Sequence, residues 1–291
     1  MVYVLSVVSA FFYGVAAVMQ HREAASAPGE QHMRFGLLVH LVKRPVWAAG
    51  IVADVIAFLF QALALGQGPL TLVQPLLTAG LLFALVLAAA WDRRRLTGFE
   101  LLAALALMTG LTLFLIAASP SPGRATVSFR RWWIAGVLVG VGVAVLVGWA
   151  RRISGRAARW RPALLGIAAS LTFAISDALI KSGIDVLHAH GLVELLDTWY
   201  LYALAGLAVL GALLVQSAFQ AGPLAMSLPA LTAVEPVASS GVGVILFAET
   251  LRTSPGALAG ELVAAALSLF GIWVLGRSPT VTGTRSLSEK V

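Results

Sequence analysis

Long apolar stretches separated by short polar connections dominate this chain of 291 residues. A helix needs about 20 mostly apolar residues to cross a bilayer. About nine stretches reach that length, so we predict an all-α polytopic membrane protein. The helices are expected over residues 2–20, 45–66, 69–90, 99–118, 132–150, 162–185, 199–219, 222–247 and 256–276.

The polar connections are too short to hold a second domain. The longest internal one, residues 22–44, mixes apolar and basic residues from Met33 onward, which predicts an amphipathic helix at the membrane surface. The small polar tail, residues 277–291, is predicted to be disordered. Residues 1–276 then form one transmembrane domain, divided into a first unit (2–118), a linking helix (132–150) and a second unit (162–276).

Composition excludes several classes of function. Hydrophobic residues make up 59% of the chain and charged residues 11%, and there is no cysteine. Disulfides, thiolate metal sites and cysteine nucleophiles are therefore absent. The sequence carries no nucleotide-binding loop, nucleophile triad or metal-ligand array. We predict neither an enzyme nor a bound cofactor.

The net charge of +7 reflects where the basic residues lie. Fifteen of the 20 Lys and Arg residues fall in connections on one side of the predicted bundle. The positive-inside rule then predicts a cytoplasmic C-terminus and an external N-terminus in the plasma (inner) membrane. The expected partner of these side chains is the lipid bilayer, not nucleic acid. All eight Trp residues lie near predicted helix ends, which is typical of the headgroup boundary.

An internal repeat links the two halves. Gly68-Pro69-Leu70, followed by Pro75, recurs as Gly222-Pro223-Leu224, followed by Pro229, at the same spacing. Five helices separate equivalent positions, and because this number is odd the second unit must be inverted. Inverted repeats with a site near the midplane are typical of alternating-access transporters.

These runs resemble a known family. Trp47–Gly50, Asp54 and residues 68–76 are similar to the first half of the drug/metabolite transporter (DMT, EamA-like) superfamily, and residues 216–236 with 247–249 to its second half. Nine helices resemble the NIPA-like magnesium transporter branch, in which an acid precedes an Asn-Phe pair in the second helix. Asp54 and Phe58 match that pattern, and Ala57 stands in place of the asparagine. The resemblance implies alternating-access transport of a small solute or divalent cation, with magnesium as the named candidate.

Asp54, Asp177 and Glu235 fall close to the centres of three predicted helices. A carboxylate at that depth costs at least ~2.5 kcal/mol, so it usually faces a protein interior or a water path. We expect all three to turn toward a shared cavity and bind a cation or proton; the alternative is that they are structural hydrogen-bonding groups. Glu235 precedes Pro236, which predicts a kinked or broken helix with free carbonyls, and Thr232 lies one turn earlier on the same side.

Several further residues have two interpretations. Asp177 and Lys181 are spaced i, i+4, which indicates a structural ion pair or a lysine competing with the substrate. Amides near helix ends either line a vestibule or join helices by hydrogen bonds. In the expected loop 186–198, His188 and His190 form a weak metal-binding signal or belong to a solvated loop. The four amides concerned are Gln61, Gln74, Gln216 and Gln220.

Residues 136–140 contain a Gly-xxx-Gly match, which indicates either a homodimer contact or packing inside the protomer. The leading hypothesis is thus a drug/metabolite-type transporter of a small solute or divalent cation. The alternatives are a proton-coupled exporter of small metabolites or drugs, and a membrane scaffold or assembly protein that transports nothing.

Overall fold

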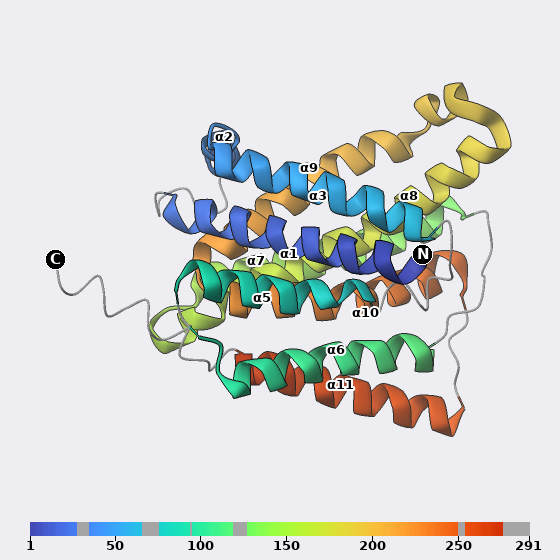
Figure 1. Cartoon of the computed structure of the whole chain (residues 1–291). Coiled ribbons are helices and arrows are strands. Elements are labelled where there is room, and N and C mark those ends of the chain that lie inside the picture. The colour runs from blue at the N-terminus through green and yellow to red at the C-terminus, as the bar shows by residue number, and fades with distance from the viewer. Residues whose placement is uncertain (28–34, 66–75, 94, 119–126, 250–253, 276–291) are drawn as a thin grey trace.

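The computed structural model describes residues 1–27, 35–65, 76–93, 95–118, 127–249 and 254–275, and the regular structure in these ranges is helical (Figure 1). Six helices are long and apolar enough to span a membrane: α1, α7, α8, α9, α10 and α11. Three further apolar helices, α3, α5 and α6, contribute shorter apolar segments. The bounds are α1 Val2–Ser26, α2 Phe35–Val42, α3 Pro45–Leu65, α5 Ala79–Trp91, α6 Gly98–Ala118, α7 Phe129–Arg152, α8 Arg161–Asp197, α9 Trp199–Ala221, α10 Leu224–Phe247 and α11 Pro255–Leu275.

Most predicted spans match these helices to within a few residues, and the count of nine membrane crossings stays a prediction. The expected surface helix within 22–44 is present as α2, whose Leu37 and Leu41 are fully buried in a cluster that includes Phe219 of α9. The start of the span 69–90, the repeat residues Gly68-Pro69-Leu70 and the tail lie outside the described residues.

The predicted loop 186–198 is wrong. α8 continues to Asp197, and within this helix the backbone departs from helical angles only at Gly191, where φ is 87°. Half of the residues from 186 to 197 are the strong helix formers Leu, Ala and Glu, which favours a helix that continues after the apolar span has ended. Glycine tolerates the positive φ that bends the helix there.

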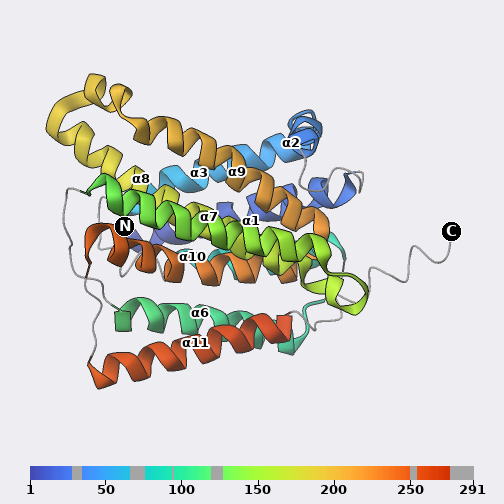
Figure 2. The ribbon, with the colours of Figure 1, turned by 180° about the vertical axis from the view of Figure 1, so that it is seen from behind.

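The helices pack in two unequal groups (Figures 1 and 2). In the larger group α1 packs against α3 and α5, while α8 packs against α7, α9 and α10. In the smaller group α6 and α11 lie side by side at one edge in both views. Their backbones approach closely, because a Cβ on Gly271 would lie only 2.7 Å from the Ala103 carbonyl oxygen.

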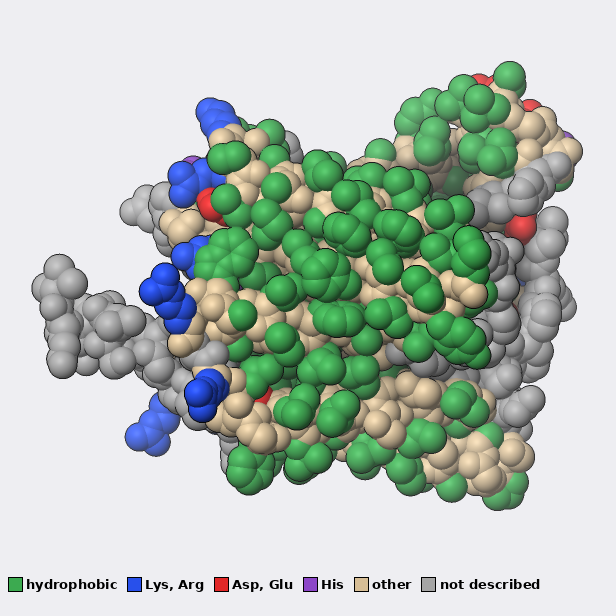
Figure 3. Space-filling model, viewed as in Figure 1, with side chains coloured by type: hydrophobic (Ala, Val, Ile, Leu, Met, Phe, Trp, Pro, Cys, Tyr) green, Lys and Arg blue, Asp and Glu red, His purple; other side chains and the backbone are tan. Residues whose placement is uncertain are grey.

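Charge separates the two ends of the bundle from its sides. Lys and Arg gather at one end of the view in Figure 3, and hydrophobic side chains cover the flank between the ends. At the basic end Arg44 binds Glu23 at 2.7 Å, and Arg22 lies 3.8 Å from Asp92. A long apolar flank with charges at its ends is what a bilayer requires. The protein is therefore an integral membrane protein.

Candidate functional site

A chain of three polar side chains crosses the larger group of helices. Gln216 of α9 donates from Nε2 to Oε1 of Gln20 of α1 at 2.6 Å, and Gln20 donates from Nε2 to Oδ2 of Asp54 of α3 at 2.5 Å. Gln216 is 2% exposed, and Gln20 is buried as well. These two hydrogen bonds join α9, α1 and α3, and the chain ends at the Asp54 carboxylate.

The direction of this chain follows from its acidic end. An ionised carboxylate only accepts hydrogen bonds, so Gln20 must turn its NH₂ group to Asp54 and its carbonyl to Gln216. Gln216 must then donate, which leaves its own Oε1 without a donor among the described residues. A buried acceptor without a donor is costly, so this oxygen is available to a cation or a ligand donor.

Two further contacts join α1 to α3 beside this chain. The Tyr13 hydroxyl donates to Gln61 Oε1 at 2.7 Å, and the Ser9 hydroxyl donates to the Ala57 carbonyl at 2.7 Å. Of the two interpretations of Gln61, the interhelical hydrogen bond is the one that the contacts support. Tyr13 also interacts electrostatically with two of the predicted acids, Asp54 and Glu235.

Glu235 and Asp177 come from the neighbouring helices α10 and α8. They interact electrostatically with each other, and Asp177 accepts a hydrogen bond from Ser239 of α10 at 2.8 Å. Glu235 is half-buried, whereas Asp177 is exposed. Helical rise places Asp177 about 24 Å from the start of α8, against about 17 Å for Glu235 in α10. Asp177 therefore lies farther along its helix than Glu235 does, and its side chain is more exposed.

The predicted ion pair between Asp177 and Lys181 is wrong. Lys181 instead binds Glu249 at 2.6 Å and lies 4.0 Å from the centre of the Phe247 ring. Glu249 reaches Lys181 because Ala248, with φ of 54°, ends α10 in the left-handed conformation and turns the chain back. Sequence spacing on one helix could not reveal this turn.

The described salt bridges leave Asp54, Asp177 and Glu235 without a Lys or Arg partner. We call these three acids, together with Tyr13, Gln20 and Gln216, the acidic centre. Asp54 and Glu235 are half-buried, and no described basic side chain pairs with either of them. Carboxylate oxygens in such a position are able to take up a proton or contribute to the coordination of a hard cation.

Other predicted residues contribute less. Thr232 donates its hydroxyl proton to the Leu228 carbonyl at 2.9 Å, within its own helix. α10 is continuous across both prolines and is not broken at Pro236. Gln220 donates to the Ala27 carbonyl at 3.2 Å and so joins α9 to the end of α1, while Gln74 lies outside the described residues.

The metal interpretation of His188 and His190 stays a prediction. Both positions belong to α8, and residues two apart on a helix do not share a face. Over the part of the chain that the structure describes, no group of three or more His, Asp or Glu side chains could hold a metal ion.

Sequence reasoning missed Tyr13 and Gln20. The signal was a polar stripe at helical spacing along the first span, formed by Ser6, Ser9, Tyr13 and Gln20. Both serines are fully buried, which places this stripe on the packed face of α1. Such a stripe in an otherwise apolar helix indicates an interior polar contact.

The fold and the acidic centre define a helical integral membrane protein with unpaired acids among its described helices. The chain is 30% identical over 244 residues to an uncharacterized protein of Corynebacterium glutamicum, covering 84% of this chain and 83% of the relative. The chain therefore belongs to the same family as that protein. No family model matches the chain, and no solved structure does.

Proposed function

We propose that this protein is a membrane transporter of the drug/metabolite type that moves a small solute or divalent cation by alternating access, with a cation or proton bound at the acidic centre. The observation that carries the proposal is the set of three acids without a basic partner in the described salt bridges, one of which, Asp54, is linked through Gln20 to Gln216 and its free oxygen. A scaffold would gain nothing from leaving intramembrane carboxylates unpaired.

The helix packing supports an inverted repeat. α1 packs on α3 and α5 in the first unit, as α8 packs on α9 and α10 in the second. The end of α1 and the start of α8 lie at the same end of the bundle. Both contact Gly222, which follows α9: His21 of α1 binds the Gly222 carbonyl at 3.0 Å, and Pro162 of α8 packs against Gly222. Equivalent helices that meet end to start run in opposite directions, as an inverted repeat requires.

The donor atoms favour a hard cation. Carboxylate and amide oxygens are the ligands of Mg²⁺, which commonly keeps several waters and uses one or two carboxylates. Two acids at mid-depth and one amide oxygen would leave further coordination positions to water. That is the pattern of a Mg²⁺ site and not of a site made wholly of protein ligands. Mg²⁺ as substrate is therefore the first candidate to test, in the plasma membrane with the basic ends cytoplasmic.

A specific contact also favours proton coupling. Tyr13 interacts electrostatically with both Asp54 and Glu235, so these two acids share a neighbour, and protonation of the acids could accompany transport. A proton-coupled exporter of small metabolites or drugs is the second candidate function.

Flux in proteoliposomes tests both candidates. Purified protein is reconstituted with an internal Mg²⁺ indicator in one set of vesicles and an internal pH indicator in another. We expect Mg²⁺ or another divalent cation of the panel (Mn²⁺, Co²⁺, Ca²⁺) to enter, and Glu235→Gln vesicles to stay at the empty-vesicle rate. Solute-driven proton movement without cation entry would favour the exporter. Silence of correctly inserted protein in both sets would overturn the transporter proposal.

A further inference from the structure

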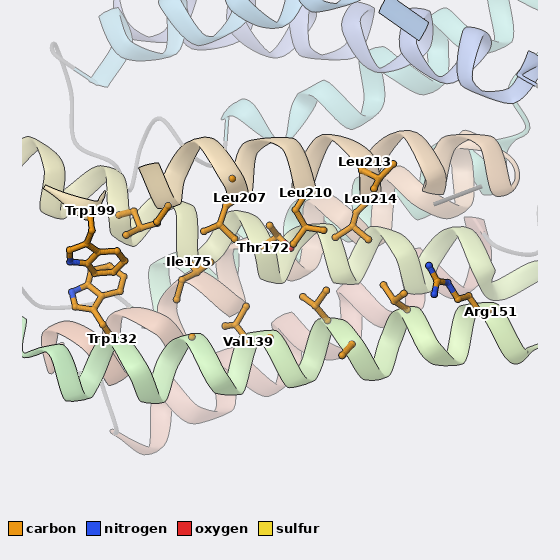
Figure 4. A pocket seen from close by; sticks show the side chains of 18 residues that line it. Trp132, Val139, Arg151, Thr172, Ile175, Trp199, Leu207, Leu210, Leu213 and Leu214 are labelled. Carbon is orange, nitrogen blue, oxygen red and sulfur yellow. The ribbon is translucent and has the colours of Figure 1, made fainter. Parts of the chain in front are cut away.

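A long groove runs between α7 and α9 over α8, on a face that the acidic centre does not use (Figure 4). Its cavity volume is about 690 Å³. Gly136 and Gly140 of α7 and Gly206 of α9 line it, and a Cβ on any of them would meet no described atom within 4 Å. Gly136 and Gly140 therefore do not pack against described residues inside the protomer, which was one of the two interpretations of their spacing. Another molecule must cover this face in a membrane.

The groove has two different ends. Trp132 and Trp199 pack edge to face at one end, with ring centres 5.2 Å apart. Arg151 lies at the other end and extends from α7 toward α9 (Figure 4). Arg151 comes 19 positions after Trp132, which corresponds to about 28 Å of helix, close to the thickness of the hydrocarbon core. The groove thus follows the membrane from one headgroup region to the other.

Among the described residues that line the groove, Arg151 is the one charged side chain. The neighbouring turn is held in place by Arg161, which donates to the carbonyls of Ala150 and Ile153, both at 2.9 Å. Arg151 itself makes no salt bridge with a described acidic side chain. A guanidinium at the mouth of an apolar groove offers two parallel hydrogen bonds to a phosphate.

We propose that this groove binds an anionic phospholipid of the leaflet at the basic end, with its phosphate on Arg151 and one acyl chain lying along the open glycines toward Gly140. The distance from Arg151 to Gly140 is about 17 Å of helix, close to half the hydrocarbon thickness and so to the reach of one chain.

Charge decides between this lipid and a second copy of the chain. Two copies in one membrane have the same orientation, so a dimer through this face would bring together two pairs of Arg151 and Arg152. Like charges at such a contact are unfavourable, whereas an anionic headgroup neutralises them. The Gly136–Gly140 spacing alone would have favoured the dimer.

Lipid retention measured by native mass spectrometry tests the proposal without any flux. Purified protein is mixed with phosphatidylglycerol or with phosphatidylcholine of the same chains. We expect bound phosphatidylglycerol on the native chain and a loss of affinity of roughly tenfold in Arg151→Gln, because contacts to charged groups are the stronger ones. Gly140→Leu fills the groove and should release both lipids.

Two control variants match the test variants: one lies next to Arg151 in the sequence, and the other lies about two helical turns from Gly140. Arg152→Gln removes the same charge outside the groove lining, and Gly148→Leu adds the same side chain at another open glycine of α7 outside the lining. Both should keep phosphatidylglycerol. Equal losses in Arg151→Gln and Arg152→Gln, or equal retention of phosphatidylcholine, would overturn the lipid site. The chain has no cysteine, so a disulfide-linked dimer of Gly140→Cys in membranes would assign the groove to a second copy instead.

Discussion

The α6–α11 pair and the acidic centre hold helices together in opposite ways. In the pair, Gly110 lies so close to α11 that a Cβ would come within 2.7 Å of the Ala264 carbonyl oxygen, and the contact is made by backbone and small side chains. In the acidic centre, side chains meet through hydrogen bonds, and one buried oxygen has no donor among the described residues. Helices in lipid associate by close packing and by hydrogen bonds between helices, so it is the buried oxygen without a donor that indicates a further role for the acidic centre.

The largest expected effect concerns the packed pair. Gly271→Leu would place a side chain against the Ala103 carbonyl and Leu107, where the backbone cannot move away cheaply. We expect destabilisation of roughly 3 kcal/mol or more, at the upper end for overpacked sites, measured as a lower unfolding temperature in detergent. Gly256→Leu is the control on the same helix, because no described atom lies within 4 Å of its Cβ. Equal unfolding temperatures for the two variants would mean that α6 and α11 are not in close contact.

The acidic centre should show the reverse behaviour. Glu235→Gln keeps the size of the side chain and removes its charge, so the unfolding temperature should stay within the error of the native value. Flux should fall by roughly tenfold or more, because an interaction with a charged group is worth about 1.5–3 kcal/mol. The same protein sample serves both measurements. Full transport by this variant would remove Glu235 from the mechanism.

Asp54 and Asp177 should differ from each other in the same assay. Asp54→Asn breaks the order of the hydrogen-bond chain, because an amide at position 54 no longer obliges Gln20 to donate. Asp177 is exposed and near the outer end, so Asp177→Asn should keep the Ser239 bond and lower flux by a smaller factor. A larger loss in Asp177→Asn would place the binding step at the outer end instead.

The sequence predicted most helices because length and apolarity alone decide whether a segment suits a bilayer. It also placed Asp54 and Glu235 near the middle of a helix, which is where they lie in α3 and α10. It missed Gln20, since a glutamine near a helix end is typical of the interface until its partner on α9 is known. It placed Lys181 wrongly because the partner, Glu249, comes close only through the left-handed turn at Ala248. Contacts between helices distant in sequence depend on packing that no local pattern encodes.

The smallest expected effect separates the two partners assigned to Lys181. Its salt bridge with Glu249 is partly exposed, so double-mutant cycles should give a coupling energy of about 0.5–1 kcal/mol between Lys181→Gln and Glu249→Gln. The cycle between Lys181→Gln and Asp177→Asn should give a coupling close to zero, since Asp177 binds Ser239. Chemical or thermal unfolding of the single and double variants measures both cycles. A larger coupling with Asp177 than with Glu249 would support the i, i+4 ion pair and contradict the turn at Ala248. Asp177 would then have a basic partner.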